Sequence, residues 1–192
     1  MNLSPFEIVY LAGFAAGSAA RVWYARPHRR GRIVRSRQTG LDTALLGVAG
    51  VALYVPLVCV FSPSLDVAKY PAPAWVGWAG AVVFAAAVWL LWWSHADLGQ
   101  NWSARLEIHD SHKLVTDGVY AHIRHPMYAA HWLWAVAQVL LIHNWIAGPA
   151  LLVGFLPLYL ARVRREEAML ADQFGEAYRA YRTRTGRIIP RW

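Results

Sequence analysis

The sequence predicts an all-α integral membrane protein, and three of its features support this fold class. Only 16% of the 192 residues are charged, whereas 57% are hydrophobic. A soluble domain carries charge on about a quarter of its residues, so lipid is expected to replace water over much of this surface. Eleven Trp and nine Tyr residues strengthen the argument, because amphipathic rings favour the headgroup level of a bilayer. The third feature is a series of long uncharged stretches.

Three apolar stretches predict transmembrane helices in the N-terminal region, residues 1–97. Residues 43–61 and 74–94 contain no charged side chain. Each is close to the roughly 20 residues with which a helix crosses about 30 Å of hydrocarbon. A third helix is expected over about 5–24, where Arg21 can extend its charged end to water at one interface.

Residues 127–161 predict a helical hairpin. They lack Asp, Glu, Lys and Arg, but a single helix of this length would measure on the order of 50 Å, too long for one crossing. His143, Asn144, Gly148 and Pro149 indicate a turn between two short antiparallel helices. The hairpin brings the count to about five transmembrane helices and returns the chain to the side from which it left.

The basic residues predict the orientation of these helices. Six arginines crowd the loop at 26–40, whereas Asp66 and Lys69 are the charged residues between the second and third spans. The positive-inside rule therefore places the Arg-rich loop in the cytosol. Five spans then place the N-terminus outside and the C-terminus in the cytosol. We expect a multi-pass membrane protein, in the cell membrane if prokaryotic, and attribute the net charge of +8 to topology and not to nucleic-acid binding.

Polar residues that could carry chemistry gather in residues 98–192, in the two cytosolic segments that flank the hairpin. In the first, 98–126, an extended stretch precedes a tight turn at Asp117 and Gly118. His125 and Pro126 follow, and proline suits the first turn of a helix. Either His125 merely precedes this helix as its cap, or His125 and the free N–H groups of the helix start face a polar ligand.

The second segment, 162–192, places two carboxylates on a packing face. Glu166 and Glu167 lie within or beside the apolar stripe of an amphipathic helix. Buried carboxylates are costly unless they meet a cation or hydrogen-bond donors. Either Arg162 forms an ordinary ion pair with Glu166 one turn away, or the carboxylates bind a cationic ligand while Arg162 binds an anion.

The second alternative suits methyl transfer from a sulfonium donor such as S-adenosylmethionine. Glu166 and Glu167 can bind the ammonium group of this cofactor, and Tyr120 can contact its nucleoside. An acceptor carboxylate is already ionised near pH 7 and needs no general base. Arg162 can hold one oxygen of that carboxylate and leave the other to attack. Positioning and exclusion of water would then suffice.

Five motifs occur in order in residues 98–192: His112-Lys113-Leu114-Val115, Gly118-Val119-Tyr120, Arg124-His125-Pro126-Met127-Tyr128, Glu166-Glu167 and Phe174-Gly175-Glu176-Ala177-Tyr178. Through these motifs the segment resembles the isoprenylcysteine carboxyl methyltransferase family and, more distantly, the phospholipid methyltransferases. The resemblance implies a cytosolic cofactor pocket that the C-terminal segment closes, and a lateral path for a lipid acceptor. It also implies a catalytic and substrate-binding role for Arg162. Cofactor contacts are implied for His112, Lys113, Leu114, Val115, Tyr120, His125, Pro126, Met127, Tyr128 and Glu166.

The expected activity is therefore S-adenosylmethionine-dependent carboxyl O-methylation of an isoprenylcysteine-like, prenylated or lipid-like acceptor, with S-adenosylhomocysteine as the second product. One alternative is amine N-methylation of a phospholipid. Another is an NADPH-dependent reductase of the sterol type, which would need clustered arginines to bind the 2′-phosphate of NADPH. A catalytic metal is not expected, because the histidines lack the spacing of membrane di-iron proteins. The expected organisation is a cofactor loop at 98–126, a hairpin at 127–161 and a cytosolic helix and tail at 162–192.

Overall fold

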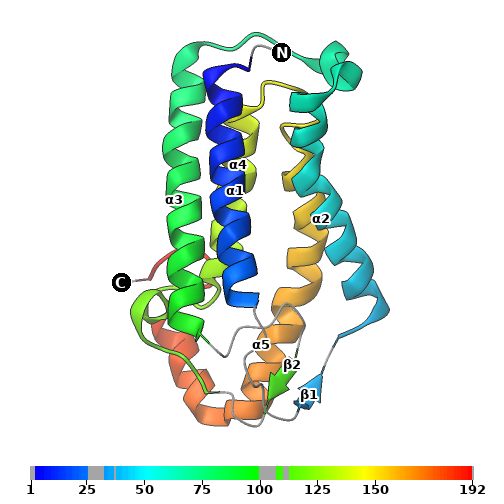
Figure 1. Ribbon diagram of the computed structural model, residues 1–192. Coiled ribbons are helices and arrows are strands. Elements are labelled where there is room, and N and C mark those ends of the chain that lie inside the picture. The colour runs from blue at the N-terminus through cyan, green and yellow to red at the C-terminus, as the bar shows by residue number, and fades with distance from the viewer. Residues whose placement is uncertain (1–2, 26–32, 37, 100–106, 110–112, 192) are drawn as a thin grey trace.

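The computed structural model describes residues 3–25, 33–36, 38–99, 107–109 and 113–191. The α-helices of this described part run along a common direction and form an elongated bundle (Figure 1). Helices lie at all the positions where the sequence predicted them, including both helices of the hairpin. They are α1 (Pro5–Ala25), α2 (Gly40–Phe61), α3 (Ala74–Leu98), α4 (Pro126–Leu141) and α5 (Ala150–Arg184), with short 3-10 helices η1 (Pro63–Ala68) and η3 (Gly118–Ala121).

The ends of the helices follow from local side-chain chemistry. A capping box begins α2: the Thr39 hydroxyl accepts the N–H of Asp42, and the Asp42 carboxylate accepts the N–H of Thr39. Pro126 occupies the first position of α4, where the missing N–H costs nothing. Between α4 and α5 the amide oxygen of Asn144 accepts two N–H groups of the turn. The predicted turn near residue 144 is thereby confirmed.

The helices pack in two groups. In the first group, α1 and α4 lie against α3, and the absence of a side chain at Gly13 lets the ring of Phe84 approach the α1 backbone. In the second group α2 packs against α5, where Gly154 faces Ala52. Fewer contacts join α4 to α5. Helices α1 and α2, which are consecutive in the chain, therefore belong to different groups.

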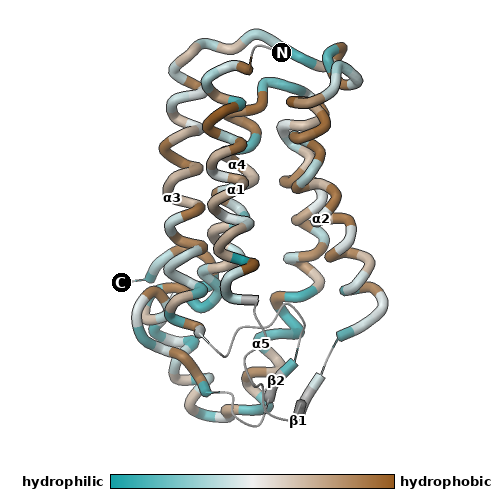
Figure 2. The backbone as a smooth tube through the Cα atoms, in the orientation of Figure 1, coloured by the Kyte–Doolittle hydropathy of each residue, from teal (hydrophilic) through white to brown (hydrophobic). Residues whose placement is uncertain are grey.

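Large hydrophobic side chains remain on the outside of the bundle. Val51 on α2, Val82 on α3 and Val153 on α5 are each 68 to 72% exposed. By length and composition, α2 and α3 can each cross a membrane. Water disfavours an apolar surface that extends over several helices, whereas lipid favours it. Figure 2 shows hydrophilic positions gathering at the end of the bundle that holds the strands.

A two-stranded sheet departs from the all-helical prediction. Strand β1 (Ile33–Ser36) lies in the Arg-rich loop and pairs antiparallel with β2 (Glu107–His109). The sheet joins the predicted N-terminal region to the predicted catalytic region. Strands of three and four residues are too short to show the alternation of apolar and polar residues from which a strand is recognised in a sequence.

Helix α5 also differs from the prediction. The second hairpin helix was expected to end near residue 161 and a separate cytosolic helix to follow. Instead, α5 continues through this point to Arg184. Its regular geometry is interrupted at Gly175, which has a φ of +54°. The charged residues after 161 are compatible with a helix. They determine only whether the helix is surrounded by lipid or by water.

Candidate active site

A cavity of about 490 Å³ lies between the two helix groups. One wall is polar and comes from the chain before and at the start of α4 and from the second half of α5. The other wall is largely apolar and comes from α1, α2 and the first half of α5. The segments 98–126 and 162–192, which the sequence predicted to meet, therefore line one cavity at the same end of the bundle (Figure 1).

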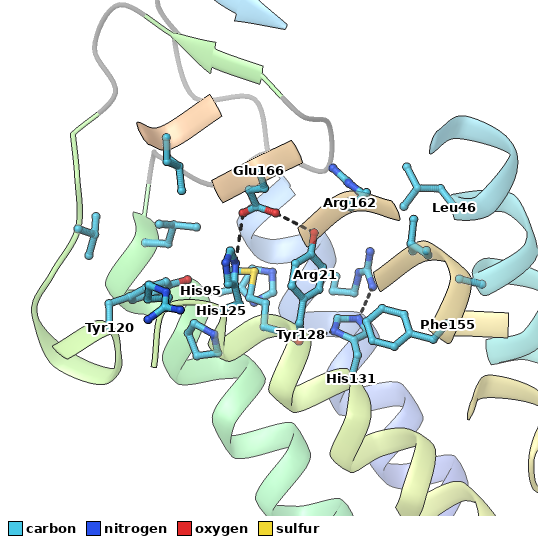
Figure 3. Close-up of a pocket in the computed structure, with 18 of the residues that line it drawn as sticks. Arg21, Leu46, His95, Tyr120, His125, Tyr128, His131, Phe155, Arg162 and Glu166 are labelled. Atoms are coloured by element: carbon cyan, nitrogen blue, oxygen red, sulfur yellow. Dashed lines mark hydrogen bonds and ion pairs between the residues drawn. The ribbon is translucent and has the colours of Figure 1, made fainter. Parts of the chain in front are cut away.

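Glu166 provides a carboxylate at the polar end of this cavity (Figure 3). Its Oε2 accepts a hydrogen bond of 2.8 Å from the hydroxyl of Tyr128. Its Oε1 lies 3.7 Å from Nδ1 of His125. The side chain is 32% exposed, so the carboxylate can still meet a further partner. Three residues that the sequence assigned to the site thus converge here.

Glu167, the next residue, is placed differently and is not among the residues that line the cavity. Its Oε1 accepts hydrogen bonds from Nε of Arg124 at 3.3 Å and from Nε of Arg187 at 3.1 Å, and its Oε2 accepts one from Nη2 of Arg187 at 2.8 Å. Burial raises the pKa of a carboxyl group, but contacts with His125 and Arg187 hold the pKa of Glu167 well below its usual range. We therefore correct the expected cofactor contact of Glu167: this carboxylate ties the C-terminal tail to α5.

The chain before α4 forms the facing part of the polar wall. Lys113, Leu114 and Val115 line the cavity, as does Tyr120 from η3. Tyr120 is buried and its hydroxyl donates to the carbonyl of Ser94 at 3.4 Å. His112, which the resemblance also assigned to the cofactor, lies outside the described residues.

A tight turn holds this part of the wall in place. Gly118 has a φ of +58°, a conformation that side chains other than glycine rarely adopt. A Cβ at this position would also collide with the carboxylate of Asp97, which accepts the N–H of Val119 at 2.7 Å. The turn predicted at Asp117 and Gly118 is confirmed, and α3 anchors it.

The start of α4 faces the cavity through Pro126 and Met127. His125, the N-cap residue of α4, forms no side-chain cap hydrogen bond within the described part of the chain. Its first N–H groups have no carbonyl of the same helix to bond, and the helix dipole favours an anion at this point. The N–H of His125 itself is used, because it donates to the carbonyl of Arg187 at 2.9 Å. Both readings of His125 therefore apply: it begins the helix and it lines the cavity.

The last turns of α5 cover the polar end. Beyond Gly175 the helix changes direction, and Tyr178 and Tyr181 line the cavity. The hydroxyl of Tyr181 donates to the carbonyl of Tyr120 at 2.7 Å. Burial raises the pKa of Tyr181 to about 12, so this hydroxyl stays a donor at neutral pH. The covering segment is thus attached directly to the facing wall.

Arg162 lies one helical turn before Glu166 and lines the cavity with 7% of its surface exposed. Figure 3 shows it on the side of Glu166 that faces Leu46 of α2. A cation therefore stands close to where the polar wall gives way to the apolar wall. The predicted juxtaposition of one guanidinium and one carboxylate on α5 is present in the structure.

Sequence reasoning missed a further basic group in the cavity. Arg21 was expected to reach water at the membrane interface, but its Nη1 lies 2.9 Å from Nε2 of His131 inside the cavity (Figure 3). His95 of α3 also lines this region. An arginine in an otherwise apolar helix is the signal that could have identified this group, because such residues usually face a cavity or a partner.

The arrangement can bind two ligands of opposite charge. A cationic ligand can bind at Glu166, and the uncapped start of α4 can accept an anionic group of the same ligand. An anion can bind at Arg162, closer to the apolar wall. Among the residues that the structure describes, no group of three or more metal-ligating side chains gathers.

Comparisons with known sequences identify relatives of the C-terminal half. Residues 78–172 match the family model of the isoprenylcysteine carboxyl methyltransferase (ICMT) family. A protein-S-isoprenylcysteine O-methyltransferase of Schizosaccharomyces pombe is 35% identical over 79 residues, which are 41% of this chain and 34% of the relative. The Homo sapiens enzyme of the same name is 35% identical over 81 residues, which are 42% of this chain and 28% of the relative. The matched segments thus span about a third of the length of these relatives.

Comparison with solved structures extends the likeness to the whole fold. The structure of the eukaryotic intramembrane Ras methyltransferase ICMT matches with a TM-score of 0.61 and 24% identity. The match covers 98% of this chain and 68% of that protein. These findings confirm the family resemblance predicted from the sequence and the helical membrane-protein fold.

Proposed function

We propose that this chain is an S-adenosylmethionine-dependent methyltransferase, because its residues 78–172 match the ICMT family model. Its acceptor is the carboxylate of an isoprenylcysteine-like or other lipid-like molecule. The observation that carries the proposal is the pair formed by Glu166 and Arg162, one turn apart on α5 and facing one cavity. The carboxylate suits the ammonium of the donor, and the guanidinium suits the carboxylate of the acceptor.

The residues at the polar end fit S-adenosylmethionine, which would supply an electrophilic methyl group. Glu166 can bind the donor's ammonium, and the uncapped start of α4 can bind its carboxylate. Among the described residues, the buried Tyr178 hydroxyl at the cavity has no hydrogen-bond partner. A buried hydroxyl usually has a partner, so its lack of one favours a polar ligand at this place. Tyr120 and Val115 are close enough to the same space to contact a nucleoside.

The residues toward the apolar wall fit a lipid-like acceptor. Leu46 and Leu53 of α2 and Phe155 of α5 line this part of the cavity and can contact a hydrocarbon chain. Arg162 can hold the acceptor's carboxylate where this chain ends. Because a carboxylate attacks without losing a proton, the chain's task is to align the two ligands and to exclude water. The covering turns of α5 supply that exclusion.

We further infer that all five helices cross the membrane, with the N-terminus outside and the cavity's polar end and the C-terminus in the cytosol. Exposed hydrophobic side chains on α2, α3 and α5 support the spans. The positions of the arginines support the orientation, because β1 belongs to the Arg-rich loop and pairs with β2, whose Glu107 lines the cavity.

Methyl transfer to a defined acceptor tests this function. Purified protein in a neutral detergent is incubated with methyl-labelled S-adenosylmethionine and a small prenylcysteine, and the product is treated with base. A carboxyl methyl ester releases labelled methanol, which is the expected result. Label that stays on the acceptor after base treatment, or label that appears on a phospholipid amine and not on the prenylcysteine, would contradict carboxyl methylation. The variant Glu166→Gln serves as the inactive control.

A further inference from the structure

We propose that Arg21 of α1, oriented by His131 of α4, is a second anion-binding group of the cavity and binds the charged headgroup of the acceptor. The proposal rests on the proposed function and adds a residue that lies outside the segment matched by the family. It makes a negative charge on the lipid-like acceptor a requirement for tight binding. It also assigns part of acceptor recognition to the N-terminal region.

Hydrogen bonds fix the protonation of His131 and the direction of Arg21. Nδ1 of His131 lies 2.6 Å from the carbonyl oxygen of Met127, which can only accept, so Nδ1 carries the proton. Nε2 lies 2.9 Å from Nη1 of Arg21, which can only donate, so Nε2 accepts. His131 is therefore a neutral ring that holds one edge of the guanidinium. Within the described part of the chain, no further hydrogen bond occupies the other donors of Arg21, so they can meet a ligand in the cavity.

The charge of Arg21 has no counterpart within the described part of the chain. No carboxylate there forms an ion pair with it, and its polar contact among the same residues is the neutral ring of His131. A guanidinium removed from water is costly unless an anion meets it. An anionic ligand in the cavity would supply the missing negative charge. An arginine that merely anchored α1 at the membrane surface would not need such a ligand.

The position of the pair fits the headgroup of a lipid. His131 follows Tyr128 by three residues, so it lies on the same face of α4 and about one turn farther from the end that holds Glu166. Figure 3 shows the guanidinium of Arg21 near Tyr128, and it shows Arg162 of α5 between Glu166 and Leu46. Arg21 and Arg162 thus border the space next to the apolar wall, whereas Glu166 borders the space of the donor. An anion there meets two cations and stays apart from the carboxylate.

This arrangement has a consequence for turnover. Methylation converts an anionic carboxylate into a neutral ester, while the positive sulfonium becomes a neutral thioether. The ester no longer attracts either guanidinium. Release of the product is therefore favoured over release of the substrate by the same residues that bind the substrate.

Direct binding without any methyl donor tests the proposal, so failure of methyl transfer would not affect the result. Myristate, tetradecyl phosphate and myristamide are titrated into the full-length protein in a maltoside detergent. Loss of a charge-assisted contact corresponds to about a tenfold change in Kd. We expect the protein to prefer the two anions to the amide, and Arg21→Gln to reduce this preference by about tenfold with the amide unchanged. The ratio between carboxylate and phosphate then identifies which headgroup fits better.

Two further variants keep the test decisive. Lys69→Gln removes a cation outside the cavity, one that pairs with Asp66, and should leave the preference unchanged. Arg162→Gln should retain part of the preference, because Arg21 remains, and this measurement does not depend on the folding of an Arg21 variant. Equal preference in Arg21→Gln and the unaltered protein would overturn the proposal. So would complete loss of the preference in Arg162→Gln, or no preference in the unaltered protein.

Discussion

At the scale of single residues, two adjacent carboxylates have different surroundings because consecutive residues of a helix point about 100° apart. Glu166 faces the cavity and keeps an open side, whereas Glu167 is enclosed by Arg124 and Arg187. The sequence placed both on the packing face but could not separate them. The partners of Glu167 come from segments that are distant in sequence, and only the tertiary fold brings them together.

Glu166→Gln tests the donor site. The substitution removes the charge that would bind the donor's ammonium, and the amide can still accept the hydrogen bond of Tyr128. We expect the Kd for S-adenosylhomocysteine to rise by about tenfold or more, with the melting temperature nearly unchanged. Isothermal titration and thermal unfolding measure the two quantities. Unchanged affinity would remove Glu166 from the donor site.

Glu167→Gln should instead lower stability. It leaves two guanidinium groups without their counter-charge, one of them largely buried, which we expect to cost about 3 kcal/mol. The Glu167→Gln protein that does fold should still bind S-adenosylhomocysteine. Denaturant unfolding in detergent measures the change, and a loss of ligand affinity without any loss of stability would contradict the structural role of Glu167.

The same carboxylate predicts a dependence of stability on pH. Its pKa is depressed in the folded protein, so its contribution is complete above the unfolded value of about 4.3 and is lost as pH falls toward the folded value. Unfolding free energies of the unaltered protein should therefore fall below about pH 5 more steeply than those of Glu167→Gln. Parallel curves for the two proteins would show that Glu167 contributes nothing to this dependence.

At the scale of elements, the helices could be predicted because each is a long apolar stretch bounded by charge, proline or turn residues. The length of α5 could not, since its second half is polar and only its packing against the preceding segment decides that the helix continues. The group that Arg21 contacts could not be predicted either. It depends on α1 lying beside α4, and an isolated apolar helix carries no signal for its neighbour.

Gly175→Ala tests the covering segment of α5. Gly175 has a φ of +54° and nothing within contact distance of an added Cβ, so the cost is conformational and amounts to about 1 kcal/mol. We expect the covering turns to shift and the affinity for S-adenosylhomocysteine to fall several-fold. The matched control is Gly47→Ala, which also meets open space but lies inside α2 and should be neutral or slightly stabilising. Equal affinities in both variants would show that the change of direction at Gly175 is unimportant for ligand binding.

At the scale of the whole molecule, the two helix groups leave a cavity between them whose walls differ in polarity. The Glu166 carboxylate lies at the polar end, whereas Arg21 and Arg162 lie closer to the apolar wall. The expected membrane orientation puts the donor end in contact with the cytosol and the acceptor end in contact with lipid. This division stays a prediction, which rests on the agreement between charge and hydropathy about which segments share a side.

Cysteine labelling tests that orientation. After Cys59 is replaced by Ala, single cysteines are introduced at Ser4, Ser36 and Thr183 in the protein in intact cells. We expect an impermeant maleimide to label the first position from outside and the other two only after the membrane is opened. Labelling of Ser36→Cys and Thr183→Cys from different sides would be incompatible with one cytosolic cavity.

Separate binding measurements with two cofactors test the proposed donor site. Isothermal titration of the purified protein with S-adenosylhomocysteine and, separately, with NADPH distinguishes a sulfonium-donor pocket from a dinucleotide pocket. We predict saturable binding of S-adenosylhomocysteine at one site per chain and no binding of NADPH. Saturable binding of NADPH, without binding of S-adenosylhomocysteine, would show that the cavity is a dinucleotide site and not a methyl-donor site.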